Sequence, residues 1–351
     1  MDKVRIVFFG TGGMGQAAHL KNYVILPDCE VIAIVEARKK IADAVAKRYN
    51  IPNVFYNIED FKAADLQFDG IVSAQQYRNQ VVIVPQLLSF GKPILTEKPL
   101  ALSIETAEKL AQMSVDSGVV HMMGYHKRSD PAMEFGKNLV DEWKKSKAFG
   151  AFKYVRSTMP AGDWVANGFD GTIFSDDPYP SMPGEGNVNY WKDGKYNVEY
   201  DVFVNYYIHQ VNALRFLLGE DYKITYAEKS KVLLAAESSS GIPCIIEMSP
   251  WVNTIDWQEQ YLVAFEKGYI LIELPAPLAS NKPGKVTVME DNGSHSTPIT
   301  WSPTLPHVHA MKNQANNFIK FIKGEKPVPC NSVEAVKDLQ IAREYIELLQ
   351  K

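Results

Sequence analysis

Three glycines that follow an apolar run near the start of the chain constrain its fold more than any other feature. The run spans residues 4–9, and Gly10, Gly12 and Gly15 then form the pattern GxGxxG. In such a turn the first glycine permits the tight bend, the second lets the backbone approach a pyrophosphate, and the third lets a helix pack on the strand. The N–H groups and the dipole at the start of that helix favour a negative group. The pattern therefore predicts a strand, a turn and a helix that bind a dinucleotide.

An acidic residue at the end of the next apolar run strengthens this interpretation. Glu36 ends the stretch VIAIVE and lies 21 residues after Gly15, where a carboxylate is expected to bind the ribose hydroxyls. A carboxylate there repels a 2'-phosphate, so NAD is favoured over NADP, although the nearby Arg38 would tolerate NADP. The residues expected to contact the cofactor are Gly10, Gly12, Gly13, Met14, Gly15, Glu36, Arg38, Ala74, Gln75, Glu97 and Lys98.

The first 124 residues alternate between strand-like and helix-like stretches. Apolar runs at 4–9, 30–35, 70–73, 93–96 and 119–123 are separated by stretches of helical period at 14–26, 38–49, 77–90 and 103–117. Ser103 and Gly118 fit the N-cap and the C' position of the last of these helices. Such alternation predicts βαβ units in a doubly wound parallel sheet, which places the chain in the α/β class.

The regular alternation of strand-like and helix-like stretches ends after Gly150. Asp130-Pro131 opens a helix to about Lys147, residues 160–200 show little periodicity, and a helix is expected over 201–218 before Gly219. Strand-like stretches over 222–301 predict a mostly antiparallel sheet, and helices at 308–323 and 333–350 close the chain. We therefore expect two domains, a nucleotide-binding domain at 1–124 and an α+β domain at 125–351.

Composition narrows the classes of partner and compartment. A formal net charge of -4 provides no electrostatic footprint for nucleic acid or an anionic membrane, and no apolar stretch approaches the length that spans a bilayer. The three cysteines form no CxxC pair, and the N-terminus shows no export signal, so we expect a cytoplasmic protein. His295, His307 and His309 lie in late polar segments without a complementary set of acids or cysteines, so no metal site is predicted.

Lysine 98 marks the edge of the expected sheet where ligands of open α/β folds bind. It stands in the run GKPILTEKPLA at 91–101. That run, the pattern GxGxMG at 10–15 and a later helix with a single histidine together resemble the glucose-fructose oxidoreductase and inositol dehydrogenase (Gfo/Idh/MocA) family. The resemblance implies a Rossmann domain followed by a domain whose open-faced sheet forms oligomer contacts. It also implies NAD(P)-linked hydride transfer at a carbinol carbon of a sugar or cyclitol, with Lys98 in a catalytic role.

The helix expected at 201–218 carries the second catalytic candidate. The family pattern D-x-G-x-H-x-x-D aligns with residues 205–212, so His209 matches the histidine while Asn205 and Asn212 replace both acids. On one continuous helix these three side chains would share a face. Asn205 would position His209 or the substrate without supplying charge, so Lys98 would share more of the proton transfer. The alternative is a core histidine that is satisfied by amide partners.

The expected substrate contacts come from three places in the chain. Residues 160–207 hold 11 aromatic side chains in 48 positions, which favours a substrate with a sugar ring because aromatic faces pack on its C–H patches. The alternative is that these rings pack an irregular loop or an oligomer interface. The cations Lys127 and Arg128, which follow Gly124, are expected at the cleft edge or, alternatively, as solvated charges. The residues expected to bind substrate are His126, Lys127, Asp163, Trp164, Tyr179, Asn205 and Asn212.

The leading prediction is an NAD(P)-dependent dehydrogenase that acts on a secondary alcohol of a sugar, glycoside or cyclitol. His209 would take the proton of the alcohol, and Lys98 would hydrogen-bond to the same oxygen. One alternative, from a different reaction class, is a redox-neutral NAD-dependent glycosidase that works through a transient keto-sugar. A second is an NAD-binding regulator without catalysis. By resemblance, a homo-oligomer, either a dimer or a tetramer, is expected.

Overall fold

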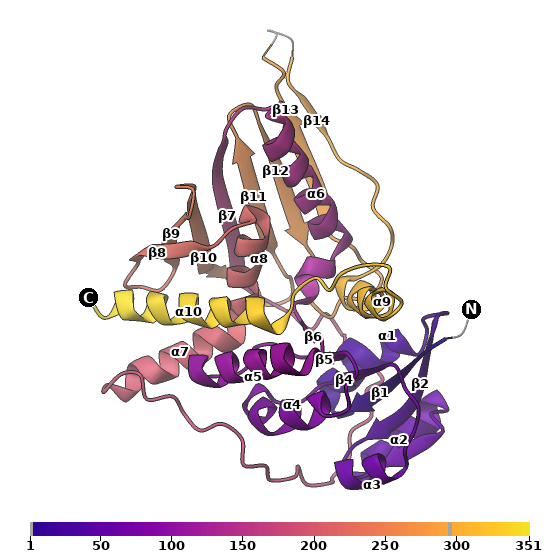
Figure 1. Cartoon of the computed structure of the whole chain (residues 1–351). Helices are drawn as coiled ribbons and strands as arrows, with labels where there is room; N and C mark the ends of the chain where they lie inside the picture. Colours follow the sequence, from indigo (N-terminus) through magenta and orange to yellow (C-terminus); the bar gives the residue numbers. More distant parts are fainter. Residues whose placement is uncertain (1–2, 294–296) are drawn as a thin grey trace. The chain divides into compact units, whose positions relative to one another are not determined.

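A computed structural model describes residues 3–293 and 297–351, so His295 lies outside the described residues. The N-terminal part forms a six-stranded parallel sheet in the order β3-β2-β1-β4-β5-β6 (Figure 1). Its strands are β1 (Val4–Phe9), β2 (Cys29–Val35), β3 (Asn53–Phe55), β4 (Gly70–Ser73), β5 (Ile94–Thr96) and β6 (His121–Met123). Its helices are η1 (Gly15–Leu20), α1 (Lys21–Tyr23), α2 (Lys39–Tyr49), α3 (Ile58–Ala63), η2 (Tyr77–Asn79), α4 (Gln80–Leu88) and α5 (Ile104–Ser117). The predicted α/β class and parallel sheet are confirmed.

Apart from β3, the strands of this sheet are almost fully buried. Ile6, Phe8 and Ile34 have 0% exposed surface, as parallel strands covered on both faces require. Phe318 and Ile319, from the late helix α9 (Ala310–Ile322), belong to the same hydrophobic cluster. The core of the nucleotide-binding sheet is therefore completed by residues almost 200 positions after its last strand.

The ends of two helices, one in each part of the chain, follow local sequence rules. Ser103 accepts a hydrogen bond from the Thr106 N–H at 3.2 Å and begins α5, and Gly118 ends it in the left-handed conformation with φ of 66°. Asp130 caps α6 (Pro131–Ser146) by accepting from the Ala132 N–H at 2.8 Å. These ends were predictable because each depends on residues within four positions.

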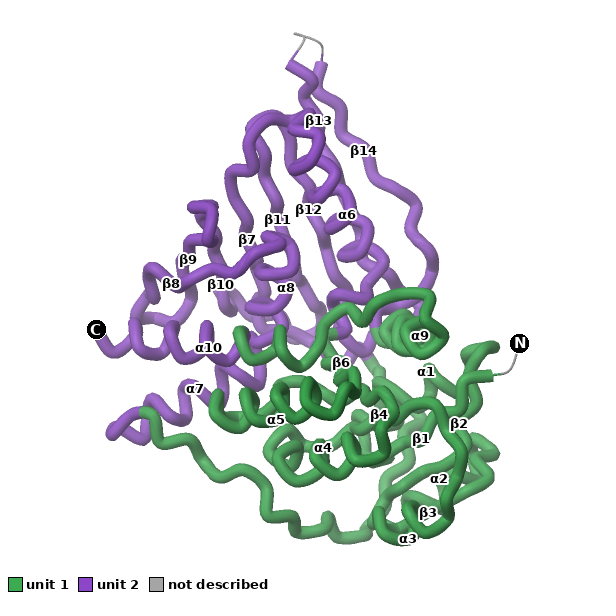
Figure 2. Tube along the Cα trace, viewed as in Figure 1, with its two compact units in different colours: residues 1–125, 167–190, 311–337 green, residues 126–166, 191–310, 338–351 purple. Residues whose placement is uncertain are grey.

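The chain groups into two compact units, coloured separately in Figure 2. Unit 1 contains residues 1–125, 167–190 and 311–337, and unit 2 contains 126–166, 191–310 and 338–351. The 167–190 segment, which runs as an extended tube below α4 in Figure 2, therefore packs with the parallel sheet. The division into domains at 1–124 and 125–351 stays a prediction, because compactness within one chain does not show which parts fold independently.

Unit 2 is built on an eight-stranded sheet in the order β14-β13-β12-β11-β7-β10-β9-β8. The strands are β7 (Phe152–Ala161), β8 (Tyr222–Ala227), β9 (Leu233–Ser238), β10 (Pro243–Val252), β11 (Glu259–Phe265), β12 (Gly268–Leu274), β13 (Lys285–Glu290) and β14 (Ile299–Trp301). The β7–β10 pair is parallel and the other pairs are antiparallel, which confirms the mostly antiparallel sheet. Helices α6 and α8 (Ile208–Leu218) lie across one face (Figure 1), and α10 (Ser332–Leu349) ends the chain.

The helix expected over 201–218 is two helices. Helix α7 (Gly194–Tyr206) ends and α8 begins at Tyr207, which has φ of -93° and ψ of -1°. The Tyr207 N–H donates to the Phe203 carbonyl at 2.8 Å, while its carbonyl accepts from the Gln210 and Val211 N–H groups. Asn205 therefore stands on α7, while His209 and Asn212 stand on α8. The prediction of one continuous helix over 201–218 is therefore wrong, while the shared face of the three side chains stays a prediction.

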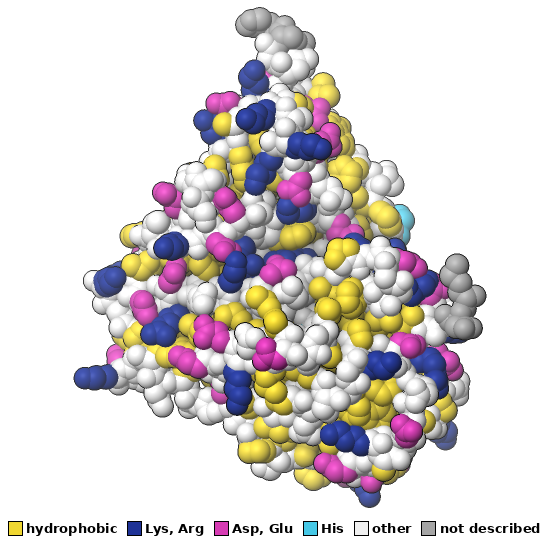
Figure 3. Space-filling model, viewed as in Figure 1, with side chains coloured by type: hydrophobic (Ala, Val, Ile, Leu, Met, Phe, Trp, Pro, Cys, Tyr) yellow, Lys and Arg dark blue, Asp and Glu magenta, His cyan; other side chains and the backbone are white. Residues whose placement is uncertain are grey.

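None of the described helices is both long and apolar enough to cross a bilayer. On the face drawn in Figure 3, basic and acidic side chains are interspersed rather than separated by sign.

Candidate active site

The glycine turn after β1 leaves no room for side chains at two of its positions. Gly10 has φ of +90°, and a Cβ built on it would lie 2.7 Å from Gln75 Nε2 and 2.8 Å from the Ala74 carbonyl oxygen. A Cβ on Gly15 would lie 2.4 Å from the Gly10 carbonyl oxygen. Such distances are shorter than any real Cβ contact, so helix and strand approach here only because both residues are glycine. The turn therefore has the form that a pyrophosphate-binding site requires.

Glu36 ends β2 beside this turn, and its carboxylate is held from three sides. It accepts from the Thr11 N–H at 2.9 Å, from Arg38 Nε at 2.9 Å and from Arg38 Nη2 at 3.0 Å. Burial raises the pKa of Glu36, but the Arg38 guanidinium and the backbone N–H groups outweigh it and hold the pKa below its ordinary value. Glu36 is thus ionised at neutral pH, at the position where a ribose diol would bind.

The 167–190 segment covers part of the glycine turn and of its neighbouring helices. Gln16 Nε2 donates to the Ile173 carbonyl at 2.9 Å, and the Ile173 N–H donates back to Gln16 Oε1 at 2.9 Å. The Phe169 ring lies 3.4 Å from the position of an added Cβ on Gly13. Tyr179, expected at the substrate, has its ring centroid 4.2 Å from the Arg38 guanidinium. Part of the aromatic-rich region thus lies against the residues expected to bind the cofactor.

Lys98 follows β5 in a turn that buried polar groups hold. Gln80 Nε2 donates to the Glu97 carbonyl at 2.5 Å and to the Pro99 carbonyl at 3.0 Å. His19 Nε2 lies 2.5 Å from Glu97 Oε1. Burial raises the pKa of Glu97, but the hydrogen bond from His19 and the charges of His19 and Lys98 bring it below its ordinary value. Lys98 itself is half-buried, and its backbone is fixed through its neighbours.

In unit 2, His209 on α8 lies against His126. The ring centroids are 4.7 Å apart at an interplanar angle of 74°. His126 is buried, His209 is half-buried and Asn205 is exposed. The structure therefore brings two of the expected site residues, His126 and His209, into direct contact within one unit.

Asn212 is committed to a buried polar network. Its side-chain oxygen accepts from Arg128 Nε at 2.6 Å, and its Nδ2 donates to Asp338 Oδ2 at 2.8 Å. Asp338 also accepts from Arg215 Nη2 at 2.6 Å. Because Asn212 is only 1% exposed and both ends of its amide are bonded, this network favours a role in fixing α8 over substrate contact.

Lys127 is buried in an ion pair rather than exposed at a cleft edge. Its Nζ donates to Glu259, whose side chain has 0% exposed surface. Glu259 also accepts from Gln210 Nε2 at 2.9 Å, from the Tyr261 hydroxyl at 2.5 Å and from Trp257 Nε1 at 3.2 Å. Burial lowers the pKa of Lys127, and the charge of Glu259 only partly restores it. We call Lys127, Gln210, Trp257, Glu259 and Tyr261 the Glu259 cluster.

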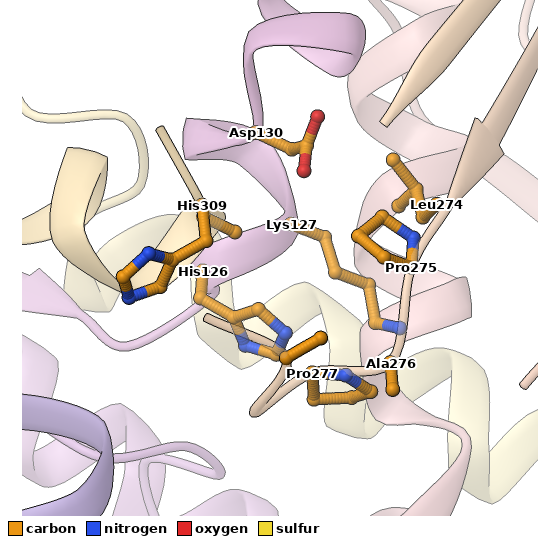
Figure 4. Close-up of a pocket in the computed structure, with 10 residues that line it drawn as sticks. His126, Lys127, Asp130, Leu274, Pro275, Ala276, Pro277 and His309 are labelled. Atoms are coloured by element: carbon orange, nitrogen blue, oxygen red, sulfur yellow. The ribbon is translucent and has the colours of Figure 1, made fainter. Parts of the chain in front are cut away.

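A small pocket lies next to this cluster within unit 2 (Figure 4). In Figure 4 the side chains of His126 and Lys127 extend toward the loop that carries Pro275 and Pro277. The lining residues are His126, Lys127, Asp130, Leu274, Pro275, Ala276, Pro277, Ala279, His309 and Ala310. His209 is not among the lining residues, but one of them, His126, contacts its ring.

The other expected substrate residues of unit 2 lie in a local turn after β7. Asp163 Oδ1 accepts from the Val165 and Ala166 N–H groups, both at 3.0 Å, and Trp164 is 37% exposed. The structure thus places Asp163 and Trp164 in a turn of their own after β7. Within residues 3–293 and 297–351 it also groups no three His, Cys, Asp or Glu side chains that could hold a metal ion.

His19, Gln16 and Glu259 were not expected among the functional residues, and Asp177 was not expected at the start of α2. His19 belongs to no sequence motif, although it stands four residues after Gly15, in the helix that follows the glycine turn. The partners of the other three are separated from them by more than 100 residues in the sequence or lie in the irregular 167–190 segment. No local pattern in the sequence signals such contacts.

The glycine turn, the parallel sheet and the acid at the end of β2 define a dinucleotide-binding protein of the Rossmann class. Residues 4–125 match the sequence model of the oxidoreductase family with an NAD-binding Rossmann fold. These residues are therefore similar to the Gfo/Idh/MocA family of oxidoreductases, and the match covers only this N-terminal part of the chain.

Two curated relatives match over part of the chain. Inositol 2-dehydrogenase of Rubrobacter xylanophilus is 30% identical over 132 residues, which cover 37% of each chain. The scyllo-inositol 2-dehydrogenase (NAD(+)) of Bacillus subtilis is 26% identical over 177 residues, or 50% of each chain. The matched part of the chain thus spans half or less of the length of these relatives.

A solved structure shows that the fold extends over the whole chain. The aldose-aldose oxidoreductase of Caulobacter crescentus, complexed with glycerol, superposes with a TM-score of 0.71. The match covers 99% of this chain and 98% of that one at 16% identity, which shows a shared fold and nothing finer.

Proposed function

We propose that the protein is an NAD(P)-dependent oxidoreductase that acts on a secondary alcohol of a sugar, glycoside or cyclitol. The observation that carries the proposal is the glycine turn with no room for side chains at Gly10 and Gly15, next to the ionised Glu36, in residues that match an NAD-binding family. A nicotinamide bound there supplies or accepts the hydride. Two relatives named as inositol dehydrogenases support a polyhydroxylated ring as substrate.

His209 and Lys98 are the proposed proton-handling groups. His209 is half-buried and packed against His126, so its ring orientation is restricted while it keeps access to solvent. Lys98 stands at the carboxyl end of β5, on a backbone held by Gln80. In this proposal His209 takes the alcohol proton and Lys98 donates a hydrogen bond to the same oxygen. Asn205, exposed at the end of α7, would contribute a hydrogen bond to the substrate.

The proposed cofactor is NAD rather than NADP. The ionised Glu36 would accept hydrogen bonds from the adenosine ribose hydroxyls and would repel a 2'-phosphate. Arg38 would not neutralise this repulsion, because its Nε and Nη2 already donate hydrogen bonds to Glu36. Tyr179, whose ring covers the Arg38 guanidinium, is proposed to act at this end of the cofactor rather than at the substrate.

The test is NADH formation on a panel of sugars, cyclitols and glycosides, with Lys98→Ala and His209→Ala compared with the parent protein. Each substitution is expected to lower kcat/KM by about 10²-fold to 10⁴-fold, the usual contribution of a positioned acid or base. Lys109→Ala and His307→Ala remove the same side chains from exposed positions and should leave the rate unchanged.

The outcomes separate the reaction classes. A variant at Lys98 or His209 that keeps the parent rate on a good substrate would remove that residue from the mechanism. Release of an aglycone without accumulation of NADH would replace the dehydrogenase by a redox-neutral glycosidase. A protein that binds NAD and converts no member of the panel would favour a regulator.

A further inference from the structure

Asp177 stands at the start of α2, although it lies 137 residues away in the sequence. Its Oδ2 accepts from the Lys40 N–H at 2.8 Å, and the Ile41 N–H lies 3.4 Å from the same oxygen. Helix α2 has 11 residues and follows the loop that begins at Glu36, so its first turn borders the proposed ribose site. A carboxylate is favoured there by the N–H groups and the helix dipole. Arg38 is the N-cap residue of α2, but its side chain makes no capping hydrogen bond. Asp177 supplies that hydrogen bond instead.

A 2'-phosphate on the adenosine ribose would need this same place. Enzymes that take NADP accommodate the phosphate with an arginine near the end of the second strand, and helix N-termini bind phosphate through free N–H groups. Here the Asp177 carboxylate already occupies the Lys40 N–H. Arg38 is bonded to Glu36, and Lys40 Nζ is paired with Asp176 at 2.7 Å. Arg38 and Lys40 are therefore paired with carboxylates, whereas the Lys39 ammonium lies over the Tyr56 ring, 5.0 Å from its centroid.

The contacts around Asp177 hold it in this place. Four residues before Asp177, Ile173 exchanges two hydrogen bonds with Gln16, and Ser175 Oγ donates to Asp177 Oδ2 at 3.3 Å. Asp177 is half-buried, whereas the neighbouring Asp176 is exposed, so the charge of Asp177 is less screened by solvent. A carboxylate that is fixed and partly desolvated repels a second anion more strongly than a mobile surface charge.

We propose that Asp177 is a specificity-determining residue that rejects the 2'-phosphate of NADP. The inference rests on the proposed dinucleotide site and adds to Glu36 a second acid, contributed by the 167–190 segment rather than by the βαβ unit. Its chemistry is exclusion: a dianionic phosphate would have to displace the Asp177 carboxylate from the first turn of α2 or lie against it.

The experiment measures binding of NAD⁺ and NADP⁺ to the purified protein by calorimetric titration, independently of any substrate. Asp177→Asn keeps a side-chain oxygen for the Lys40 N–H and removes the charge. It is expected to tighten NADP⁺ binding by roughly ten-fold, the effect of removing one close like charge, and to change NAD⁺ binding by less than about two-fold. Asp170→Asn is the matched control, because it removes an exposed carboxylate from the same segment and should change neither affinity.

Asp177→Ser provides a second, uncharged cap and should reproduce the effect of Asp177→Asn. The proposal is overturned if both variants bind NADP⁺ no better than Asp170→Asn does, or if they lose NAD⁺ and NADP⁺ affinity in parallel, which would indicate a structural cap alone. If the parent protein binds neither dinucleotide, the proposed function fails instead, and the two results are distinguishable.

Discussion

At the scale of single residues, Asp130 caps a helix although its burial disfavours the charged form of its side chain. It caps α6 and accepts from the Gly284 N–H at 3.0 Å, and it is 1% exposed. Burial raises the pKa of Asp130 to about 6, against the lowering effect of its two backbone donors, and the carboxylates of Glu259 and Glu134 raise it further. An acid of this kind binds its proton more tightly in the folded protein than in the unfolded chain.

The contribution of Asp130 to the free energy of unfolding should therefore fall as pH rises from about 4 to about 6 and stay level above that. Asp130→Asn keeps the acceptor oxygen and removes the charge, so we expect it to be more stable than the parent at pH 7 by about 2 kcal/mol. The difference should vanish at pH 4. Urea denaturation at both pH values measures it, with the exposed Asp170→Asn as control, and an Asp130→Asn protein less stable than the parent at pH 7 would contradict the prediction.

A residue of the site was predictable from the sequence only where its partners lie close to it along the chain. Gly10, Gly15 and Glu36 belong to one strand–turn–helix–strand stretch, so the pattern alone locates them. Asp177 reaches the Lys40 N–H across 137 residues, and Glu259 reaches Lys127 across 132. Such pairs depend on the tertiary fold, and neither Asp nor Glu in an irregular or strand segment signals a buried partner.

At the scale of elements, the Glu259 cluster joins three parts of unit 2. Glu259 begins β11, Lys127 precedes α6 and Gln210 lies on α8. With the Tyr261 hydroxyl and the Trp257 indole, four donors converge on one carboxylate. Because Gln210 follows His209 and Lys127 follows His126, the cluster holds the residue next to each of the two histidines in contact.

Removal of one charged partner should cost more than removal of both. Lys127→Met leaves Glu259 buried without a cation and should lower the free energy of unfolding by about 3–5 kcal/mol. Lys127→Met with Glu259→Gln should lose less than the sum of the two single variants, because no buried charge remains. Chemical denaturation of the four proteins gives the coupling energy.

Lys137→Met is the control for this cycle, since it breaks a surface pair with Asp141 and should change stability by less than about 1 kcal/mol. Additive losses for the two cluster variants would show that the ion pair does not act as a unit.

Elements with long, regular patterns were predictable, and short or interrupted ones were not. β3 has only three half-buried residues, and neither it nor α3 was expected. The junction at Tyr207 was missed because residues 201–218 keep a helical composition on both sides of it. The change of direction depends on where the Phe203 and Tyr207 carbonyls find donors, which composition does not reveal.

At the scale of the whole molecule, α6 and α8 cover one face of the sheet of unit 2, and no helix among the described residues covers the other. Along β11 and β12 buried and half-buried residues alternate, with Ile272 beneath Gly136 of α6. On the opposite face Leu262 and Leu271 are paired neighbours and only half-buried. Apolar rows of this kind on an open sheet favour contact with another copy of the chain.

We expect a homo-oligomer that uses this face, as the family resemblance implies. Leu271→Lys should reduce the solution mass, measured by light scattering, toward the 39.4 kDa of one chain. Val202→Lys, at an exposed position on α7, should leave the assembly intact. A parent protein that already runs as a monomer, or a Leu271→Lys protein that keeps the parent mass, would refute the assignment of this face.

Unit 1 combines segments that are far apart in the sequence, and this affects how it can fold during synthesis. Its sheet is encoded in the first 123 residues, yet the Met123 N–H donates to the Cys330 carbonyl, and Phe318 fills the core beneath β1. Domains made on the ribosome generally fold as they emerge, N-terminal first. The parallel sheet would leave the ribosome before the residues that complete its core, because about 200 further residues must still be translated. The nascent chain thus exposes an apolar sheet surface for most of its synthesis, and that interval is when a holding chaperone would matter most.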